Sequence, residues 1–239
     1  MKRFISFAAA ILTACLVSCT GEADSGDFSD QETALIEKAD SIMRVLTITD
    51  STDNAILRAV STDLSLKALL SEDYARLEEL MVSTVTHPSQ DGVGIAGPQV
   101  GLNRRVVAVQ RFDKEGEPFE VYPNIRIVWL SDSKAYGPEG CLSVPDMRGE
   151  VSRSQEIVIE YADMAALRHG KDDDICGIPV KRDTISGFTA VIFQHEVDHL
   201  EGVLYIDRLL LTSTLQSHKT KGFQDHYRQN QGFHDNFSI

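Results

Sequence analysis

The run His195-Glu196-Val197-Asp198-His199 constrains the fold more than any other part of this sequence. Residues four positions apart project from the same face of an α-helix, so the imidazoles of His195 and His199 can bind one divalent ion together. Glu196 follows the first histidine and lies close enough to reach a water molecule on that ion. The motif alone leaves one alternative, a pair of solvated histidines on a surface helix. We therefore predict a helix here, with a metal site that the rest of the chain must complete.

This helix is predicted to start near Ser186-Gly187 and to stop at Glu201-Gly202. Gly202 suits a helix C-cap, where the backbone often adopts the left-handed conformation that favours glycine. One face of the helix carries apolar residues together with both histidines: Phe188, Val191, Ile192, His195 and His199.

The rest of the chain predicts two further helices and a set of strands. Apolar residues fall at helical spacing in two segments, first at Leu35, Ile36, Ala39, Ile42, Met43 and Leu46, and then at Leu66, Leu69, Leu70, Leu77, Leu80 and Met81. Short β-type runs between Gly, Pro and Asp turns predict antiparallel strands at 105–110, 118–123, 125–130 and 156–161. We expect a surface loop at 166–174 and a loosely held polar tail from Thr212 onward. The predicted fold class is α+β, with antiparallel β-sheets packed around a central metal-binding α-helix.

The amino terminus has the pattern of an export signal. Lys2 and Arg3 precede a run from Phe4 to Val17 that contains no charge, no Pro and no Gly. This is typical of the basic and apolar regions of a signal peptide. The run is shorter than the ~20 residues that a membrane-spanning helix needs. We therefore predict that residues 1–18 are a signal peptide that is removed.

The signal ends in Leu16-Val17-Ser18-Cys19, which resembles the lipobox of bacterial lipoproteins. The resemblance implies that Cys19 is acylated and becomes the new amino terminus, which would anchor the protein to a membrane. The alternative is an ordinary secretory signal in which Cys19 is incidental. Residues 20–31 are mostly Gly, Ser, Asp and Glu, so we expect a solvated tether that does not pack.

Charge and cysteine content narrow the functional classes. Removal of residues 1–18 takes away two basic residues and no acidic one, so the formal net charge of -13 becomes -15. Nucleic acid and anionic lipid surfaces are therefore poor partners. Once Cys15 is cleaved off and Cys19 is acylated, only Cys141 and Cys176 are left, which excludes a disulfide framework. Cys141 therefore needs another explanation.

A catalytic metal site with two histidines needs a third protein ligand and an open position for water. Downstream of His199 stand only Glu201, a few other acids and three histidines of the polar tail. Upstream, the chain contains two further motifs: Gly92-Val93-Gly94-Ile95-Ala96-Gly97-Pro98-Gln99 and Glu139-Gly140-Cys141-Leu142-Ser143. Together with the histidine motif, in this order, they resemble the GxGxAAPQ, EGCLS and HExDH signatures of the peptide deformylase family. The resemblance extends from about Asp53 to Leu211.

The resemblance implies a role for each matching residue. Cys141 would be the third metal ligand, bound as a thiolate, beside His195 and His199. Glu196 would act as the acid and base of the reaction. The side chain of Gln99 and the backbone N–H of Leu142 would donate to the oxyanion. The alternatives are a small buried hydrophobic residue for Cys141 and a polar loop residue for Gln99.

Further residues would hold the substrate or orient the ligands. The backbone around Val93, Gly94 and Ile95 would pair with an extended peptide, which the missing side chain of Gly94 permits. The pocket for a methionine side chain would be lined by Phe188, Val191 and Ile192, although core packing gives the same spacing. Three charged residues match family positions and could orient the histidines or form surface ion pairs: Glu139, Arg153 and Asp198.

Two departures from the family pattern stand out. Gly97 occupies a position where the family usually has Ala, which could loosen the loop that carries Gln99. The segment 166–182 is longer than the typical hairpin.

The sequence is thus identified as a member of the peptide deformylase family. It divides into a signal peptide (1–18), a flexible acidic tether (19–31), a catalytic domain (32–211) and a polar C-terminal tail (212–239). The implied reaction is the hydrolysis of the N-formyl group of N-formylmethionyl peptides with one Fe²⁺ or Zn²⁺ ion. The alternatives are a metallopeptidase or amidase, and a non-catalytic lipoprotein that binds metal or peptide. We expect an extracytoplasmic, membrane-anchored bacterial lipoprotein.

Overall fold

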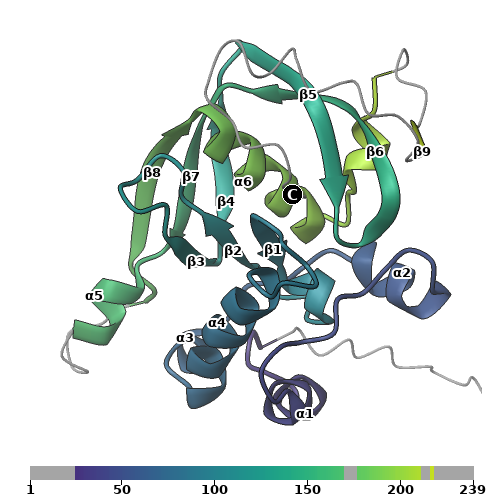
Figure 1. Cartoon of the computed structure of the whole chain (residues 1–239). Helices are drawn as coiled ribbons and strands as arrows, with labels where there is room; N and C mark the ends of the chain where they lie inside the picture. Colours follow the sequence, from purple (N-terminus) through teal and green to yellow (C-terminus); the bar gives the residue numbers. More distant parts are fainter. Residues whose placement is uncertain (1–24, 170–176, 211–215, 218–239) are drawn as a thin grey trace, which may run out of the picture.

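The computed structural model of the chain describes residues 25–169, 177–210 and 216–217 (Figure 1). The predictions for the signal peptide, Cys19, Cys176 and most of the C-terminal tail fall outside these residues. The described helices are α1 (Asp30–Lys38), α2 (Ser51–Leu57), α3 (Leu66–Leu69), α4 (Glu72–Val85), η1 (Gly97–Val100), α5 (Met164–His169), α6 (Gly187–Leu200) and η2 (Tyr205–Arg208). The described strands are β1 (Gly94–Ala96), β2 (Val106–Gln110), β3 (Phe119–Pro123), β4 (Arg126–Leu130), β5 (Lys134–Cys141), β6 (Val144–Ser154), β7 (Glu156–Ala162), β8 (Val180–Ser186) and β9 (Gln216–Ser217).

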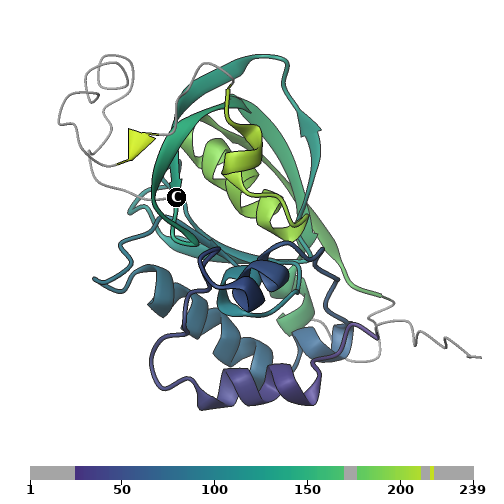
Figure 2. The same cartoon turned by 90° about the vertical axis from the view of Figure 1, so that its right-hand side faces the viewer.

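The strands form three antiparallel sheets that surround one helix. Their orders are β1-β2-β3, β4-β7-β8 and β5-β6-β9. Helix α6 runs between the sheets, whereas α1, α3 and α4 form a layer on the other side of the β1-β2-β3 sheet (Figures 1 and 2). This arrangement confirms the predicted α+β class and the central place of the helix that carries the histidines.

Helix α6 is buried almost all round, as its central position requires. Eleven of its fourteen residues are buried, so it lacks the polar face of a surface helix. Its bounds agree with the prediction: Ser186 is the N-cap and Glu201 the C-cap. Gly202 then has a φ of 68°, and a Cβ there would lie 2.4 Å from the carbonyl oxygen of Arg58. Only glycine fits this turn.

Three of the predicted helical and loop segments need correction. The first helix ends at Lys38, not near Leu46, because the Asp40 and Ser41 that follow favour turns over helix interior. The second predicted helix is two helices, since Ser71 interrupts it and caps α4 by accepting from the N–H of Tyr74. The predicted surface loop begins inside α5, which the carboxylate of Asp163 caps.

The tether prediction is wrong for the part that the structure describes. Phe28 packs against the core, and Ser29 caps α1. Asp27 accepts hydrogen bonds from Ser65 and Lys67. The acidic residues that predicted a solvated segment are thus partners of groups on the folded body.

The four predicted strands are present as β2, β3, β4 and β7. The structure also contains strands that the sequence did not predict. Strands β1, β5, β6 and β8 were not predicted, because they contain Gly, Pro or charged residues at positions that their sheets tolerate. Helix α2, capped by the side chain of Asp50, was missed as well. No helix among the described residues combines the length and apolar composition of a membrane span.

Gly97 does not loosen its loop. A Cβ at this position would lie 2.6 Å from the carbonyl oxygen of Arg104 and 2.8 Å from that of Leu102. The backbone N–H of Leu102 also donates to the carbonyl of Gly97 at 2.9 Å. The glycine therefore allows two backbone segments to pack against each other at a distance that alanine excludes.

We predict that Gly97→Ala destabilises the protein by about 3 kcal/mol, the upper part of the range for overpacking, because backbone oxygens cannot move aside. Gly116→Ala is the control. Gly116 has a φ of 75° and open space around its Cβ position, so the alanine should cost only about 1 kcal/mol of backbone strain. Urea unfolding measures both. Equal losses for the two variants would show that the loop yields readily.

Candidate metal centre

Three predicted ligands meet at the centre of the fold. Cys141 ends β5, and His195 and His199 lie one turn apart on α6. One potential ligand atom of each residue lies within 4.8 Å of the others. The Sγ of Cys141 is 3.3 Å from the Nε2 of His199. Each of the three residues is at most 5% exposed, so the cluster is shielded from solvent.

The polar atoms of this cluster fit a divalent cation. His195 Nε2, His199 Nδ1 and both carboxylate oxygens of Glu196 are buried without a hydrogen-bond partner among the described residues. Such atoms are rare in folded proteins unless water or an ion satisfies them. Two imidazoles and one thiolate are a donor set that suits Zn²⁺ or Fe²⁺. Cys141, His195 and His199 are therefore the residues that could hold the ion.

The protein alone favours the neutral forms of these groups. Burial, and then the charge of Glu196, raise the pKa of the Cys141 thiol. Burial, and then the charges of His195 and Arg153, hold the pKa of His199 well below its usual range. A neutral imidazole can donate its lone pair, whereas the thiol loses its proton only when a cation offsets the cost of burial.

Glu196 sits beside the ligands in an environment that favours its protonated form. Its side chain is fully buried and presses on β1, because a Cβ at Gly94 would lie 2.5 Å from its Oε1. Burial, and then the charge of Glu139, raise the pKa of Glu196 well above its ordinary value. A carboxyl group with a raised pKa can both take up and release a proton near neutral pH.

A buried chain of charges supports His195 and the end of α6. The Nδ1 of His195 is 2.8 Å from Glu139, which also accepts two hydrogen bonds from Arg153. Arg153 donates at 2.6 Å to Asp198, and Asp198 also accepts from Arg208. Burial alone would raise the pKa of Glu139, but the hydrogen bonds from Arg153 and His195 lower it to about 2.

This burial decides between the two interpretations of the charged residues. Glu139, Arg153 and Asp198 are 2%, 5% and 8% exposed, so they are not surface ion pairs. They orient a histidine from behind, as carboxylates do at metal sites. Arg208 was not predicted, since nothing in the sequence marks it as the partner of Asp198.

Gln99 points toward the cluster from the short 3-10 helix η1. Its Oε1 accepts from the backbone N–H of Ala96 at 2.8 Å, which turns its Nε2 toward the ligands. Nε2 is 3.6 Å from the Sγ of Cys141 and 3.3 Å from the Oγ of Ser143. Leu142 is half-buried in the turn between Cys141 and Ser143. Ser143, which is fully buried, was not assigned a role from the sequence.

The predicted peptide-binding strand lies at the edge of its sheet. Among the described residues, β1 pairs only with β2, and Val93 directly precedes it. Val93 and Ile95 are fully buried. Any residue larger than glycine at position 94 would collide with Glu196. The sequence did not predict this requirement for Gly94.

The three predicted pocket residues of α6 do not share one environment. Ile192 is fully buried in the core between α6 and the sheets, as the core-packing alternative expects. Phe188 and Val191 are half-buried at the edge of the same cluster, and the Phe188 ring lies 5.4 Å from that of Phe112. Another residue absent from the prediction is Tyr205, which stacks on His195 at 6.0 Å and donates to the carbonyl of Met147.

Comparison with known proteins identifies the family to which this chain belongs. The family profile described as polypeptide deformylase matches residues 43–214. The chain belongs to the polypeptide deformylase family. It is 37% identical over 166 residues to a peptide deformylase of Leptospira biflexa, which covers 66% of this chain and 85% of the relative. Its identity to a peptide deformylase of Rhizobium meliloti is 35% over 154 residues, with 64% and 78% covered.

Solved deformylase structures have the same fold. The actinonin-bound class I type b peptide deformylase of Acinetobacter baumannii gives a TM-score of 0.58 at 30% identity and covers 72% of this chain and all of that one. The peptide deformylase of Thermotoga maritima gives 0.58 at 28% identity, with 71% and 98% covered. The predicted family and enzyme class, a metallohydrolase with one Fe²⁺ or Zn²⁺ ion, are confirmed.

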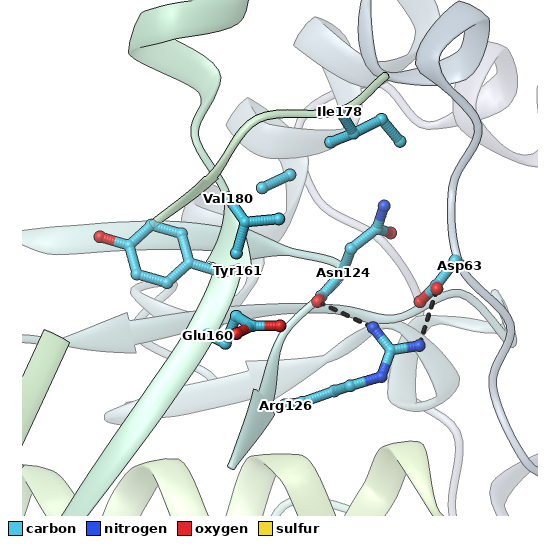
Figure 3. A pocket seen from close by; sticks show the side chains of 8 residues that line it. Asp63, Asn124, Arg126, Glu160, Tyr161, Ile178 and Val180 are labelled. Atoms are coloured by element: carbon cyan, nitrogen blue, oxygen red, sulfur yellow. Dashed lines mark hydrogen bonds and ion pairs between the residues drawn. The ribbon is translucent and has the colours of Figure 1, made fainter. Parts of the chain in front are cut away.

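A cavity of about 150 Å³ elsewhere on this deformylase contains none of the metal-centre residues (Figure 3). At this cavity Arg126 donates to Asp63 and to the backbone carbonyl of Asn124 (Figure 3). Glu160, Tyr161, Ile178 and Val180 line the other side (Figure 3). Its charged side chains pair with one another or with a neighbour, as Arg126 does with Asp63 and Glu160 with Arg182.

We predict that Glu139→Gln weakens metal binding ~10- to 100-fold, because His195 loses the carboxylate that orients it. Competition with a chromogenic chelator measures the affinity. Glu156→Gln, the same change at an exposed position on β7, is the control and should bind metal as the wild type does. Unchanged affinity in Glu139→Gln would show that the buried charge chain does not act on the ligand.

Proposed function

We propose that this chain hydrolyses the N-formyl group of N-formylmethionyl peptides and releases formate. The observation that carries the proposal is the convergence of Cys141, His195 and His199 with Glu196 and Gln99 in a buried cluster of a deformylase fold. A bound Fe²⁺ or Zn²⁺ ion supplies an activated water and polarises the formyl carbonyl.

Residues of the chain carry out the proton transfers of the reaction. Glu196 takes one proton from the attacking water, whose oxygen forms a bond to the formyl carbon. As the bond between this carbon and the amide nitrogen breaks, Glu196 delivers the proton to the nitrogen. The products are formic acid, which ionises to formate, and a peptide with a free amino group. The raised pKa of Glu196 supports both proton transfers.

Gln99 stabilises the negative charge that forms on the formyl oxygen. Its Nε2 has no closer partner than Ser143 Oγ and Cys141 Sγ, so it can turn a hydrogen toward an oxyanion beside the ligands. The backbone N–H of Leu142 is the proposed second donor. Each such donor contributes on the order of 3 kcal/mol in the transition state.

The edge of β1 is the proposed place for the peptide backbone. Gly94 and Ile95 pair with β2 on one side, the carbonyl of Val93 accepts from the N–H of Gln110, and an added strand would pair with the other edge. The methionine side chain would contact the half-buried Phe188 and Val191 of α6, with Ile192 behind them. A metallopeptidase or amidase, and a non-catalytic binding lipoprotein, are the competing functions.

One assay separates these functions. Formate release from formyl-Met-Ala is expected from the metal-loaded protein, whereas a peptidase would release formylmethionine and alanine. A non-catalytic binder would release neither. Acetyl-Met-Ala is the matched control substrate, because its extra methyl group should crowd the buried metal position.

We predict that Glu196→Gln keeps stoichiometric metal but loses at least ~10²-fold in kcat, the usual contribution of a general acid and base. Glutamine fills the same space against Gly94, so the fold is preserved. Metal analysis and formate release are measured on the same sample. Turnover near that of the wild type, or loss of the metal, would show that the proton carrier has been misassigned.

We also propose that the protein is exported and held to a membrane through acylated Cys19. The basic and apolar run and the sequence Leu16-Val17-Ser18-Cys19 support this. Phe28 packs against the core, and a chain reaches at most about 32 Å over the nine residues from Cys19 to Phe28. The catalytic domain would therefore work close to the membrane surface, not at the end of a long tether.

The anchor predicts a clear fractionation result. The wild-type chain should appear in the membrane fraction, and Cys19→Ala should release it or leave it unprocessed, because the acylated residue is lost. Mass spectrometry of the amino-terminal peptide identifies the modification. Cys176→Ala, which leaves the signal intact, serves as the control. An unmodified Met1 in the soluble fraction would rule out both export and anchoring.

A further inference from the structure

We propose that residues 25–42, here called the N-terminal strap, position Gln99 for the reaction and act through the ion pair of Glu32 with Arg104. The proposal rests on the role of Gln99 as an oxyanion donor. The strap lies outside the family profile, which begins at Met43, so family membership does not supply it.

The strap is built onto the folded body by specific contacts. Ser29 and Glu32 form a capping box at the start of α1. Thr33 donates to Asp73 of α4 at 2.7 Å, and Arg76 of α4 donates to the carbonyl of Ile36 at 3.2 Å. Both views place α1 on the outside of α4, on the side away from α6 (Figures 1 and 2). The strap thus has no access to the metal centre except through intervening residues.

Arg104 is the link between the strap and the body. Its Nε and Nη2 donate to the two carboxylate oxygens of Glu32 at 2.7 and 2.9 Å. It also donates to the carbonyl of Asp27 and to the hydroxyl of Thr62, each at 2.8 Å. The Arg104 side chain is only 7% exposed. A bidentate pair with this burial fixes the position of the arginine, and with it the backbone that carries it.

The backbone of Arg104 supports one end of the loop that bears Gln99. Its carbonyl lies against Gly97, where even a Cβ would not fit. At the other end, the side chain of Leu35 on α1 lies 3.2 Å from the Cβ position of Gly101, whose φ is 90°. Four residues after the end of the strap, the N–H of Leu46 donates to the carbonyl of Gln99 at 2.8 Å. The loop from Gly97 to Gly101 is therefore held at both ends and in the middle.

This support matters because oxyanion donors tolerate little displacement. A donor must lie about 2.7–3.1 Å from the oxyanion to be effective. If Glu32 releases Arg104, the support of Gly97 weakens and the Nε2 of Gln99 is displaced from its place beside Cys141. The variant should lose part of the transition-state stabilisation that Gln99 contributes. The metal ligands, which lie on α6 and β5, should keep their positions.

A double-mutant cycle tests the coupling. Glu32→Gln should lower kcat/KM for formyl-Met-Ala on the order of 10-fold, a part of the 10²–10³-fold effect of an oxyanion donor. In the Gln99→Ala background the same substitution should change kcat/KM less than about 2-fold, because the donor is already absent. Metal content should stay the same throughout. An equal loss in both backgrounds, or no loss from Glu32→Gln, would overturn the proposal.

Asp73→Asn is the matched control. It replaces the charged acceptor of the strap's bond from Thr33 with a neutral amide oxygen and does not touch Arg104, so it should lower the Tm slightly but leave kcat/KM unchanged. If Glu32→Gln does not fold, Leu35→Ala replaces it. This substitution removes the side chain that lies next to the Cβ position of Gly101, at a residue that is 38% exposed, and it should show the same coupling to Gln99.

A second measurement does not depend on the proposed reaction. The side-chain amide signal of Gln99 in a ¹⁵N NMR spectrum is assigned by its loss in Gln99→Ala. Glu32→Gln should shift or broaden this signal, and Asp73→Asn should not. A wild-type protein that releases no formate would refute the proposed function alone. An unchanged Gln99 signal in Glu32→Gln would refute the proposed role of the N-terminal strap.

Discussion

The structure depends on the buried pair of Glu139 with Arg153. A lone carboxylate at this depth would cost several kcal/mol in desolvation. Arg153 offsets that cost and also pairs with Asp198. The carboxylate is then ionised and free to accept the proton of His195 Nδ1, which leaves Nε2 to face Cys141 and His199. The metal centre is a consequence of this arrangement.

The same burial explains why the chemistry is concentrated on one helix. Because α6 is enclosed by sheets, its polar residues must be satisfied by groups from other elements: Glu139 on β5, Arg153 on β6 and Arg208 on η2. Both oxygens of Glu196 have no hydrogen-bond partner among the described residues, and its side chain lies against Gly94 of β1. An unsatisfied carboxylate in a packed interior is tolerated where a substrate or an ion is to be bound.

The sequence predicted the site better than it predicted the rest of the fold. The three motifs predicted residues that the structure brings together, namely Cys141, His195, His199, Glu196 and Gln99, because these residue types are chemically specific in such spacing. The strands with Gly and Pro were missed, since β5 and β6 are formed by pairing across the sheet and not by local propensity. The residues 25–31 were misread because acidic side chains resemble a solvated tether until their partners Arg104, Ser65 and Lys67 are known. Tyr205, Ser143 and Arg208 act only through tertiary contacts, which no local pattern reveals.

The central claim is that one cation binds to Cys141, His195 and His199. X-ray absorption spectroscopy of the zinc-loaded protein tests it most directly, because sulfur and nitrogen ligands differ in their distance to the metal. We expect one sulfur at about 2.3 Å and two imidazole nitrogens at about 2.0–2.1 Å, with the sulfur contribution lost in Cys141→Ser. A spectrum with only nitrogen and oxygen ligands, or with a sulfur that survives this substitution, would contradict the assignment of the metal centre.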